Sequence, residues 1–183
     1  MSEARLTTEF FNRDVLQVAP CMLGKTLVRV YPDGTVGRFC ITETEAYRGI
    51  EDLACHASKG LTPRTQAMFG PAGFLYVYLI YGIYWMLNIV ADTENNASAV
   101  LIRGINEVIG PGRVGRLLQI DKSFYGESLA LSNRIWIEGD ASEIVNHSTH
   151  KRVGIDYAGE PWVSKPWRFR SEYENLNYKT ARN

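Results

Sequence analysis

Apolar and polar positions follow two different periods along the first quarter of the chain. Residues 8–22 carry apolar side chains at roughly helical spacing and are followed by Gly24, a residue type that often ends helices, so we expect a helix there. The next residues alternate with the period of two that is typical of strands. TLVRVY (26–31) and VGRFCITETEAY (36–47) flank the turn sequence PDGT, which predicts a β-hairpin.

The most apolar segment is FLYVYLIYGIYWMLNIVA (74–91). Its 18 residues carry no formal charge and just reach the length of a membrane helix. Its tyrosines, Trp85, Asn88 and the central Gly82 would make a poor lipid-facing surface, and its aromatic and β-branched residues favour strands. We therefore expect no membrane span but a second, buried hairpin that turns at residues 81–84.

The remaining pattern adds short elements. Thr62-Pro63 predicts a short helix that runs to Met68, and GPGR at 110–113 predicts another that runs toward Leu118. Further strands are expected at 97–105 (ASAVLIRGI), 134–139 (RIWIEG) and 152–159 (RVGIDYAG), and a loose polar tail from residue 171. Because strands outnumber crossover helices and hairpins join most of them, we predict one compact α+β domain over residues 1–183 with a mostly antiparallel sheet.

Composition narrows the choice of partner and compartment. Lys and Arg total 20, and so do Asp and Glu, so the chain has no overall field that would attract nucleic acid or an anionic membrane. Any site for a polyanion must be a local patch. Cys21, Cys40 and Cys55 are odd in number and show no CxxC spacing, as expected for reduced thiols. The polar N-terminus shows no signal-peptide pattern, and together these features predict a cytoplasmic protein.

The segment ITETEAYRGIEDLACHA (41–57) holds the first candidate for chemistry. With a period of two, Glu43 and Glu45 continue the face that Phe39 and Ile41 begin, so an apolar strand face becomes acidic and ends at Tyr47. A carboxylate held at the end of a strand in a partly desolvated place can act as a general base. It can equally form a structural ion pair, and the spacing does not choose between the two.

The sequence gives little support for a metal or a nucleotide cofactor. Glu43, Glu45, Cys55 and His56 could supply metal ligands, but they lack the second Cys or His pair that zinc sites use. The HxxH of residues 147–150 lies in a polar, turn-like segment that predicts a solvated loop. GxGxxG, GxxxxGK[ST] and GxSxG are missing from the sequence, so neither a nucleotide cofactor nor a serine nucleophile is expected.

Aromatic residues gather near the acidic segment. Tyr76 and Tyr78 share one face of their predicted strand, and Tyr81 lies on the turn that follows, where it is exposed by geometry. Such residues usually belong to a core or an interface. However, flat rings around an acid, with one protruding aromatic, also suit a protein that stacks a planar base and fills the gap left in a duplex. Asn88 is either a satisfied core amide or a group that tests base edges.

These residues belong to longer motifs that occur in the order found in one known family. The motifs are LGKTLVR (23–29), ETEAYRGIEDLACHA (43–57), TPRTQAMFGPAG (62–73), LYVYLIYGIYWMLNI (75–89), AVLIRG (99–104), GPGRVGRLLQI (110–120) and RVGIDYAGEPWVSKPWRF (152–169). On these motifs, from about Phe10 to Phe169, the chain resembles the alkyladenine or 3-methyladenine DNA glycosylases, which are monofunctional base-excision enzymes.

The resemblance implies a role for each of several side chains. Glu45 matches the glutamate that activates the water attacking C1′ of the deoxyribose, and Arg103 matches the arginine that helps to hold that water and the neighbouring phosphate. Tyr47, His56 and Tyr78 match the pocket that sandwiches the flipped base, with His56 also hydrogen-bonding the edge of the base. Tyr81 matches the tyrosine that intercalates into the duplex, and Asn88 matches the side chain that disfavours guanine. Glu43 matches no assigned role.

The resemblance also implies a fold and a reaction. The fold would be a curved, open-barrel-like antiparallel sheet with surrounding helices and a protruding hairpin. The reaction would be hydrolysis of the N-glycosidic bond of alkylated or deaminated purines, such as 3-methyladenine or hypoxanthine, which initiates base excision repair. The expected partner is double-stranded DNA that contains a damaged purine, bound by a monomer without metal or cofactor.

The neutral net charge is low for a DNA-binding enzyme, because affinity for DNA rests largely on neutralised phosphates. Arg113, Lys165 and Arg168 are therefore the candidates for local phosphate contacts. Two other functions are compatible with the residues alone. One is a non-catalytic nucleic-acid-binding module on a similar scaffold, and the other is a small-molecule hydrolase that uses Glu45.

Overall fold

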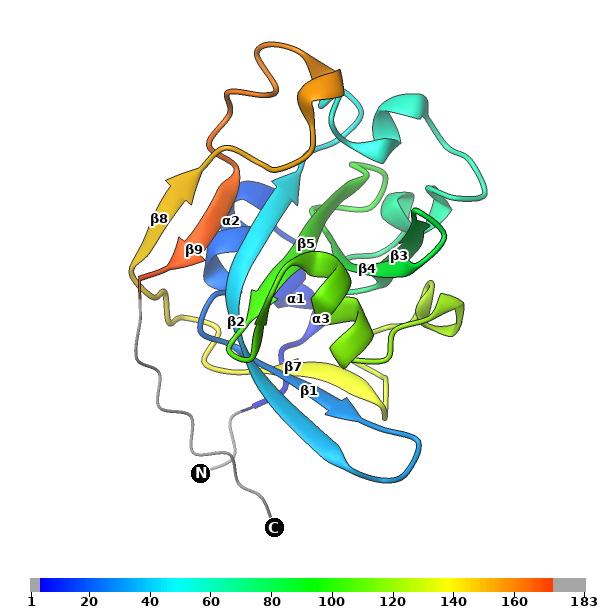
Figure 1. Ribbon diagram of the computed structural model, residues 1–183, viewed down its shortest axis with the longest axis vertical. Coiled ribbons are helices and arrows are strands. Elements are labelled where there is room, and N and C mark those ends of the chain that lie inside the picture. Colours follow the sequence, from blue (N-terminus) through cyan, green and yellow to red (C-terminus); the bar gives the residue numbers. More distant parts are fainter. Residues whose placement is uncertain (1–3, 173–183) are drawn as a thin grey trace.

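One curled antiparallel sheet organises the chain in the computed structural model, which describes residues 4–172 (Figure 1). The strand order is β3-β4-β5-β2-β1-β7, with β6 beside β5 and with β9 between β2 and β8. The strands are β1 Thr26–Val30, β2 Val36–Tyr47, β3 Leu75–Ile80, β4 Tyr84–Ala91, β5 Ser98–Ile105, β6 Val108–Ile109, β7 Ile135–Glu138, β8 His147–His150 and β9 Arg168–Ser171. The predicted strand-rich α+β fold with an antiparallel sheet is confirmed.

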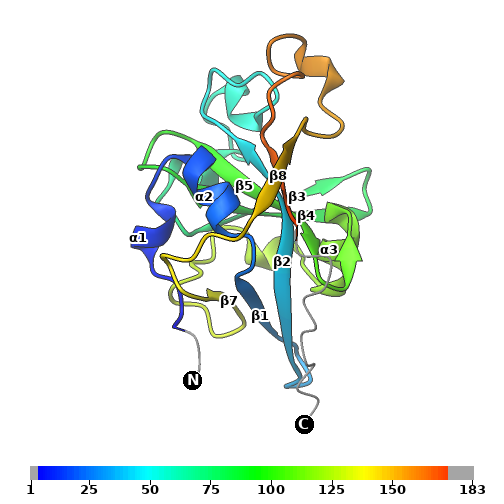
Figure 2. The same ribbon diagram turned by 90° about the vertical axis from the view of Figure 1, so that its left-hand side faces the viewer.

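Short helices cover this sheet. The α-helices are α1 Thr8–Phe11, α2 Val15–Cys21 and α3 Pro111–Leu117, and the 3-10 helices are η1 His56–Lys59, η2 Gln66–Phe69, η3 Lys122–Phe124 and η4 Asp156–Ala158. α2 lies on one side of β2, while α3 and the turn between β3 and β4 stand out on the opposite side (Figure 2). Among residues 4–172 the longest helices have 7 residues, far fewer than a bilayer span requires. Residues 74–91 form β3 and β4, as predicted.

Two predicted helices are shorter than expected. The helix expected over residues 8–22 is divided into α1 and α2, because the Asp14 side chain accepts a hydrogen bond from the Leu16 N–H at 2.8 Å and so begins a new helix. The helix expected from Thr62 to Met68 is a turn followed by η2. The Thr62 hydroxyl accepts from the Thr65 N–H at 3.2 Å, which makes the predicted cap, but only a 3-10 turn follows.

Three further expectations are wrong near the C-terminus. Residues 152–159 form a loop with η4 instead of a strand, and the predicted solvated loop at 147–150 is the strand β8. β8 pairs with β9, a distant partner that local pattern does not reveal. The predicted loose tail begins too early, because Ser171 still pairs with His147. Residues 173–183 of that tail lie outside the described residues.

An irregularity in the pairing of β2 with β5 decides which side chains reach the site. Ile41 pairs with Ile105 and Thr44 with Ile102, but the register shifts on both sides of Glu43, which pairs with Gly104. Two residues, Thr42 and Glu43, therefore lie between the core-facing positions Ile41 and Thr44, where a regular strand has one. Ile41 and Ala46 pack in the main core, and the Thr44 hydroxyl donates to the Ala19 carbonyl of α2 at 2.9 Å.

The predicted face assignment of the acidic residues is consequently wrong. Glu43 and Glu45 do not continue the face of Phe39 and Ile41, because the register shift turns them to the opposite side of the sheet, away from the main core. Gly104 has no side chain, and this leaves room for the irregular pairing at Glu43. A Cβ atom at this position would lie 2.9 Å from the Glu43 Cβ, which is closer than real Cβ atoms approach other atoms, and a tight 3.0 Å from the Thr42 Oγ1.

Candidate active site

A hollow of about 480 Å³ opens on the face of the sheet that carries Glu45. β2, β3, β4 and β5 form its floor, and the loops around η1 and η4 form its rim. The predicted catalytic, pocket and intercalating residues all line it, although they come from separate parts of the chain: Glu45, Tyr47, His56, Tyr78, Tyr81, Asn88 and Arg103. We refer to it as the tyrosine cavity.

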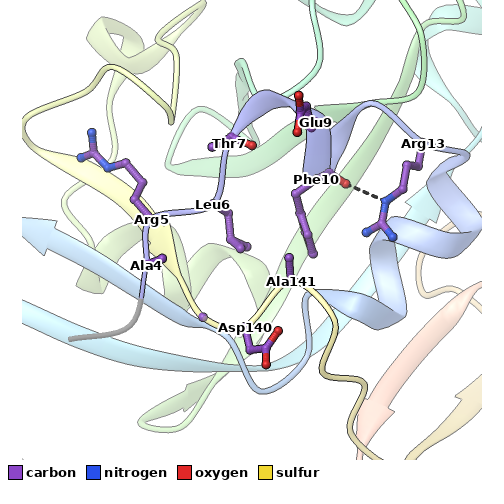
Figure 3. A pocket seen from close by; sticks show the side chains of 10 residues that line it. Ala4, Arg5, Leu6, Thr7, Glu9, Phe10, Arg13, Asp140 and Ala141 are labelled. Carbon is purple, nitrogen blue, oxygen red and sulfur yellow. Dashed lines mark hydrogen bonds between the residues drawn. The ribbon is translucent and has the colours of Figure 1, made fainter. Parts of the chain in front are cut away.

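A second hollow, of about 660 Å³, lies between residues 4–13 and 139–141 (Figure 3). It contains none of the predicted site residues. Its Arg13 turns back to donate from Nε to the Phe10 carbonyl at 2.9 Å and stacks over the Phe10 ring (Figure 3). Although this hollow is larger, its side chains do not converge on a common point, so the tyrosine cavity is the better candidate for chemistry.

Glu45 is the carboxylate that lines the tyrosine cavity, and none of its surface is exposed. Its Oε1 accepts a hydrogen bond from the Val153 N–H, and its Oε2 accepts one from the Tyr47 hydroxyl, both at 2.9 Å. Arg103 Nη1 lies 3.6 Å from Oε1. Burial raises the pKa of Glu45, while Arg103 and the two hydrogen bonds act to lower it. The site therefore combines an oriented carboxylate with increased basicity.

Glu43 has a clear structural partner set. Its Oε1 lies 2.7 Å from Arg168 Nη1 and 3.4 Å from Arg103 Nε. The longer contact is ionic and lacks hydrogen-bond geometry, since Arg103 Nε is a buried nitrogen without a hydrogen-bond partner among the described residues. The chain of charges Arg168–Glu43–Arg103–Glu45 therefore alternates in sign. Through it, Glu43 holds Arg103 beside Glu45, an assignment that the sequence did not supply.

A buried ion pair that the sequence did not predict supports Glu45 and Tyr47. Arg152 donates to both carboxylate oxygens of Asp52, at 2.5 and 2.9 Å, and both side chains are fully buried. Its guanidinium also lies 4.8 Å from the centre of the Tyr47 ring. Val153, which donates to Glu45, is the next residue in the chain. The pair joins loops about 100 residues apart in sequence. The one sequence signal that could have indicated this ion pair is that both residues lie within family motifs.

Tyrosine rings and an imidazole form a further part of the cavity wall. His56 Nδ1 lies 2.8 Å from the Tyr76 hydroxyl, and the His56 ring meets the Tyr78 ring edge-on with centroids 4.6 Å apart. Burial, and then the charge of Arg64, lower the pKa of His56 to about 4. Burial raises the pKa of Tyr76 to about 12. The His56 and Tyr76 side chains are therefore uncharged near pH 7. Arg64, which the sequence did not indicate, stacks over Tyr78 with 5.1 Å to the ring centre.

Asn88 lies at the base of the cavity, and Tyr81 lies at its rim. The Asn88 amide donates to the Tyr76 and Met86 carbonyls at 3.0 and 3.4 Å, which leaves the amide oxygen as the polar atom it can offer to the cavity. Tyr81 is 84% exposed at the tip of the hairpin, as predicted. Its φ of 52° and the φ of 69° at Gly82, with a hydrogen bond from the Ile83 N–H to the Ile80 carbonyl at 3.1 Å, define a tight turn.

The three predicted phosphate contacts do not form one patch. Arg168 is engaged with Glu43 and donates from Nε to the Lys151 carbonyl at 2.8 Å. Lys165 Nζ stacks against the Trp162 and Trp167 rings at 5.0 and 4.8 Å. Arg113 is exposed on α3 and lines a different hollow. The structure therefore separates these residues by environment, and only Arg168 directly joins the ionic chain that reaches Glu45.

Comparisons with known proteins identify a family for the chain. A family model described as methylpurine-DNA glycosylase (MPG) matches residues 9–110 and 106–175. Relatives whose names assign them to the 3-methyladenine DNA glycosylases occur in distant organisms. One from Methanocella arvoryzae is 39% identical, with 90% of each chain covered. One from Desulfitobacterium hafniense is 40% identical, with 92% of this chain and 95% of the relative covered. One from Legionella pneumophila (strain Corby) is 43% identical, with 90% and 93% covered.

Proposed function

The chain belongs to the methylpurine-DNA glycosylase family and is an N-glycosyl hydrolase of the DNA-3-methyladenine glycosylase type, and from this premise we propose how it acts. A damaged purine leaves the duplex, enters the tyrosine cavity and loses its bond to deoxyribose through attack by a water that Glu45 activates. One observation carries the proposal. A fully buried carboxylate with a raised pKa lies in a hollow that aromatic rings surround.

Glu45 would act as the general base. The attacking water must lose a proton as it bonds to C1′, and a carboxylate with a raised pKa accepts that proton more readily than an ordinary one. The Val153 N–H and the Tyr47 hydroxyl fix the direction of the carboxylate before the substrate arrives. Arg103, held by Glu43, keeps a positive charge next to Glu45, where it would also face the phosphate of the flipped nucleotide.

The rings would hold the base. Tyr47 would lie against one face, and Tyr78 with His56 against the other. His56 is neutral near pH 7 and bonded to Tyr76, so it would act as a hydrogen-bonding group for the edge of the base and not as a proton donor. Cationic alkylated purines need little help to leave, which suits a wall without a charged acid. The Asn88 amide would disfavour guanine by crowding its exocyclic amine.

Tyr81 would fill the space that the flipped base vacates. Its exposure at the tip of a tight turn, at the rim of the cavity, supports this assignment. Phosphate contacts would come from Arg113, Lys165 and Arg168. Arg168 is also in ionic contact with Glu43. One duplex site on one chain requires only a monomer, and the substrate would be chromosomal DNA inside the cell.

A base-release assay tests this function. The protein is incubated with a duplex that contains one hypoxanthine or one methylated purine, and with the same duplex that contains adenine as the control. We expect free damaged base together with alkali-labile abasic sites in the lesion duplex, and neither product in the control. Salt-dependent DNA binding without base release would indicate a non-catalytic module. The absence of both binding and release would instead favour a small-molecule hydrolase.

A further inference from the structure

The arginines of the described chain differ in whether they have partners. Most of them form hydrogen bonds, ion pairs or ring contacts, including the exposed Arg64 and Arg116, which stack on Tyr78 and Tyr84. Within residues 4–172, the side chains of Arg113 and Arg170 alone make no such contact. Both are exposed, and both line one hollow of about 530 Å³. Two unpartnered guanidinium groups in one hollow indicate a site for an anion.

This hollow, which we name the arginine groove, is built by β2, β5, β6, β9 and the first turn of α3. Thr42 and Asn106 add further polar groups to its lining. The Asn106 side-chain oxygen accepts from the Cys40 N–H at 2.9 Å, so its NH2 group is the part that can donate to a ligand. The groove therefore offers guanidinium, amide and hydroxyl donors, which are the groups that bind phosphate oxygens.

Two acidic residues also line the arginine groove and must be accounted for. Glu43 contacts Arg168 at 2.7 Å and Arg103 at 3.4 Å, so two cations already offset its charge. Glu107 is exposed and makes no ion pair within the described residues, so it opposes an anion from the outer edge of the groove. With Glu43 offset, two free positive charges face one free negative charge. A diffuse monoanion is a better fit to this balance than a compact multiply charged ligand.

The position of the arginine groove identifies the anion. Glu43 lines the groove, Arg103 lines the tyrosine cavity, and the two side chains are in ionic contact, so the two hollows are neighbours. A nucleotide in the tyrosine cavity would stay covalently attached to its strand, so a hollow next to the cavity is a place where a neighbouring phosphate of that strand would be bound. Each linkage of that strand carries one negative charge on its phosphate. This step rests on the proposed function, since it takes duplex DNA as the substrate.

We propose that Arg113 and Arg170 form a subsite for a phosphodiester of the damaged strand, next to the flipped nucleotide. The subsite would hold the strand on the side of Glu43 that faces away from the base. Arg113 and Arg170 come from α3 and β9, which are about 57 residues apart in sequence but meet at this groove, so the subsite depends on the folded sheet.

Salt dependence of binding provides the first test. Wild type, Arg113→Gln, Arg170→Gln and the double variant are titrated onto a duplex that carries a tetrahydrofuran abasic analogue, which has no base to lose. We expect the double variant to bind about tenfold more weakly. We expect its plot of log K against log salt to be shallower by about 1.8, because each lost phosphate contact removes about 0.9 from the slope. An unchanged slope would overturn the proposal.

Arg38→Gln is the matched control. Arg38 is also an exposed arginine of β2, but it lies at the opposite end of the strand and pairs with Glu138. The Arg38→Gln variant loses the same charge as each of the other single variants, but residue 38 does not line the arginine groove. Its salt slope should therefore equal that of wild type. If Arg38→Gln lowers the slope as much as Arg170→Gln does, the loss reflects net charge alone and the subsite assignment is wrong.

Neutral linkages locate the subsite. A single methylphosphonate is placed in turn at each of the linkages flanking the abasic analogue on the same strand. We expect one linkage at which wild type loses affinity while the double variant, which no longer has the contact, does not. The absence of any such linkage would contradict the proposal even if the salt slope changes. The base-release assay of wild type decides the proposed function separately, because it does not depend on Arg113 or Arg170.

Discussion

The two halves of β2 form one continuous strand, but they have different neighbours and different surroundings. The first half, from Val36 to Ile41, pairs with β1, buries Phe39 and Ile41 in the core and places Arg38 on the surface beside Glu138. The second half, from Glu43 to Tyr47, is held between β5 and β9 and directs Glu45 and Tyr47 into the tyrosine cavity. Both halves carry charged side chains, but only those of the second half are buried.

The carboxylates beside the two halves respond to their surroundings in opposite ways. Partial burial acts to raise the pKa of Glu138, but hydrogen bonds from Arg38 and Trp136 hold it below its ordinary value. At Glu45, burial prevails and the pKa is raised. The two halves of β2 meet at the pairing irregularity around Glu43. On one side of it lies the surface ion pair of Arg38 with Glu138, and on the other lies Glu45, a carboxylate basic enough to abstract a proton.

The largest effect is expected from Glu45→Gln. The amide keeps the shape of the side chain but cannot accept a proton from water, so the single-turnover rate of base release should fall by about 10² to 10⁴-fold. Binding to the lesion duplex should persist. Glu138→Gln, the matched change beside the first half, should leave the rate unchanged. A near wild-type rate for Glu45→Gln would assign the chemistry to another group.

The pH profile should show the raised pKa of Glu45. A general base works when deprotonated, so the single-turnover rate should fall about tenfold for each pH unit below that pKa and level off above it. The midpoint should lie above the ordinary carboxyl value, because burial raises it. With a pKa of about 4, His56 should add no second transition near neutrality. A profile that is flat down to the ordinary carboxyl range would contradict this.

Glu43→Gln should have an intermediate effect. It removes the charge that holds Arg103 and Arg168, both largely buried, so we expect a rate about tenfold lower and a free energy of unfolding lower by about 1–3 kcal/mol. Chemical denaturation and single-turnover rates measure the two losses. Arg38→Gln, which breaks the exposed pair of the first half, should cost less than about 1 kcal/mol and no activity. Equal effects of both variants would remove the distinction between the halves.

The smallest effect on the rate is expected from Gly104→Ala. The added methyl group would press on Glu43 and Thr42, shift the second half of β2 and lower the rate by about three- to tenfold, with about 1–3 kcal/mol of lost stability. In Gly37→Ala the new Cβ would meet the Phe39 ring 2.5 Å away, a clash confined to the first half. That variant should lose stability but keep its rate. A rate loss in both would show that the halves are mechanically coupled.

The sequence predicted the strands better than their faces. Alternation of apolar residues located the strands at 26–31 and 36–47, and aromatic and β-branched content located the hairpin at 74–91, because both patterns depend on local sequence. The same alternation placed Glu43 and Glu45 on the wrong side, since the irregular pairing depends on Gly104 in a different strand. β8 and β9 were missed for a related reason, because their short polar sequences become strands only by pairing with each other and with β2.

The candidate site divides in a similar way. The cavity residues were identified through their family motifs, and the structure brings them together, although composition and spacing alone could not separate a catalytic Glu45 from a structural one. Asp52 and Arg152 were missed because their relation exists only in three dimensions, across two loops. The unpartnered state of Arg113 and Arg170 is likewise a property of the folded chain, which no local pattern expresses.

The tight turn that carries Tyr81 has a consequence for the speed of searching. A repair protein meets very many intact base pairs for each lesion, so any ordering step at the probe would be repeated at every one of them. Here the left-handed φ values of Tyr81 and Gly82 and the hydrogen bond across the turn already fix the backbone of the free protein. Tyr81 can therefore enter the duplex, as proposed, without a change in the backbone of its turn. The time spent at each base pair can then be as short as the time that the base pair takes to open.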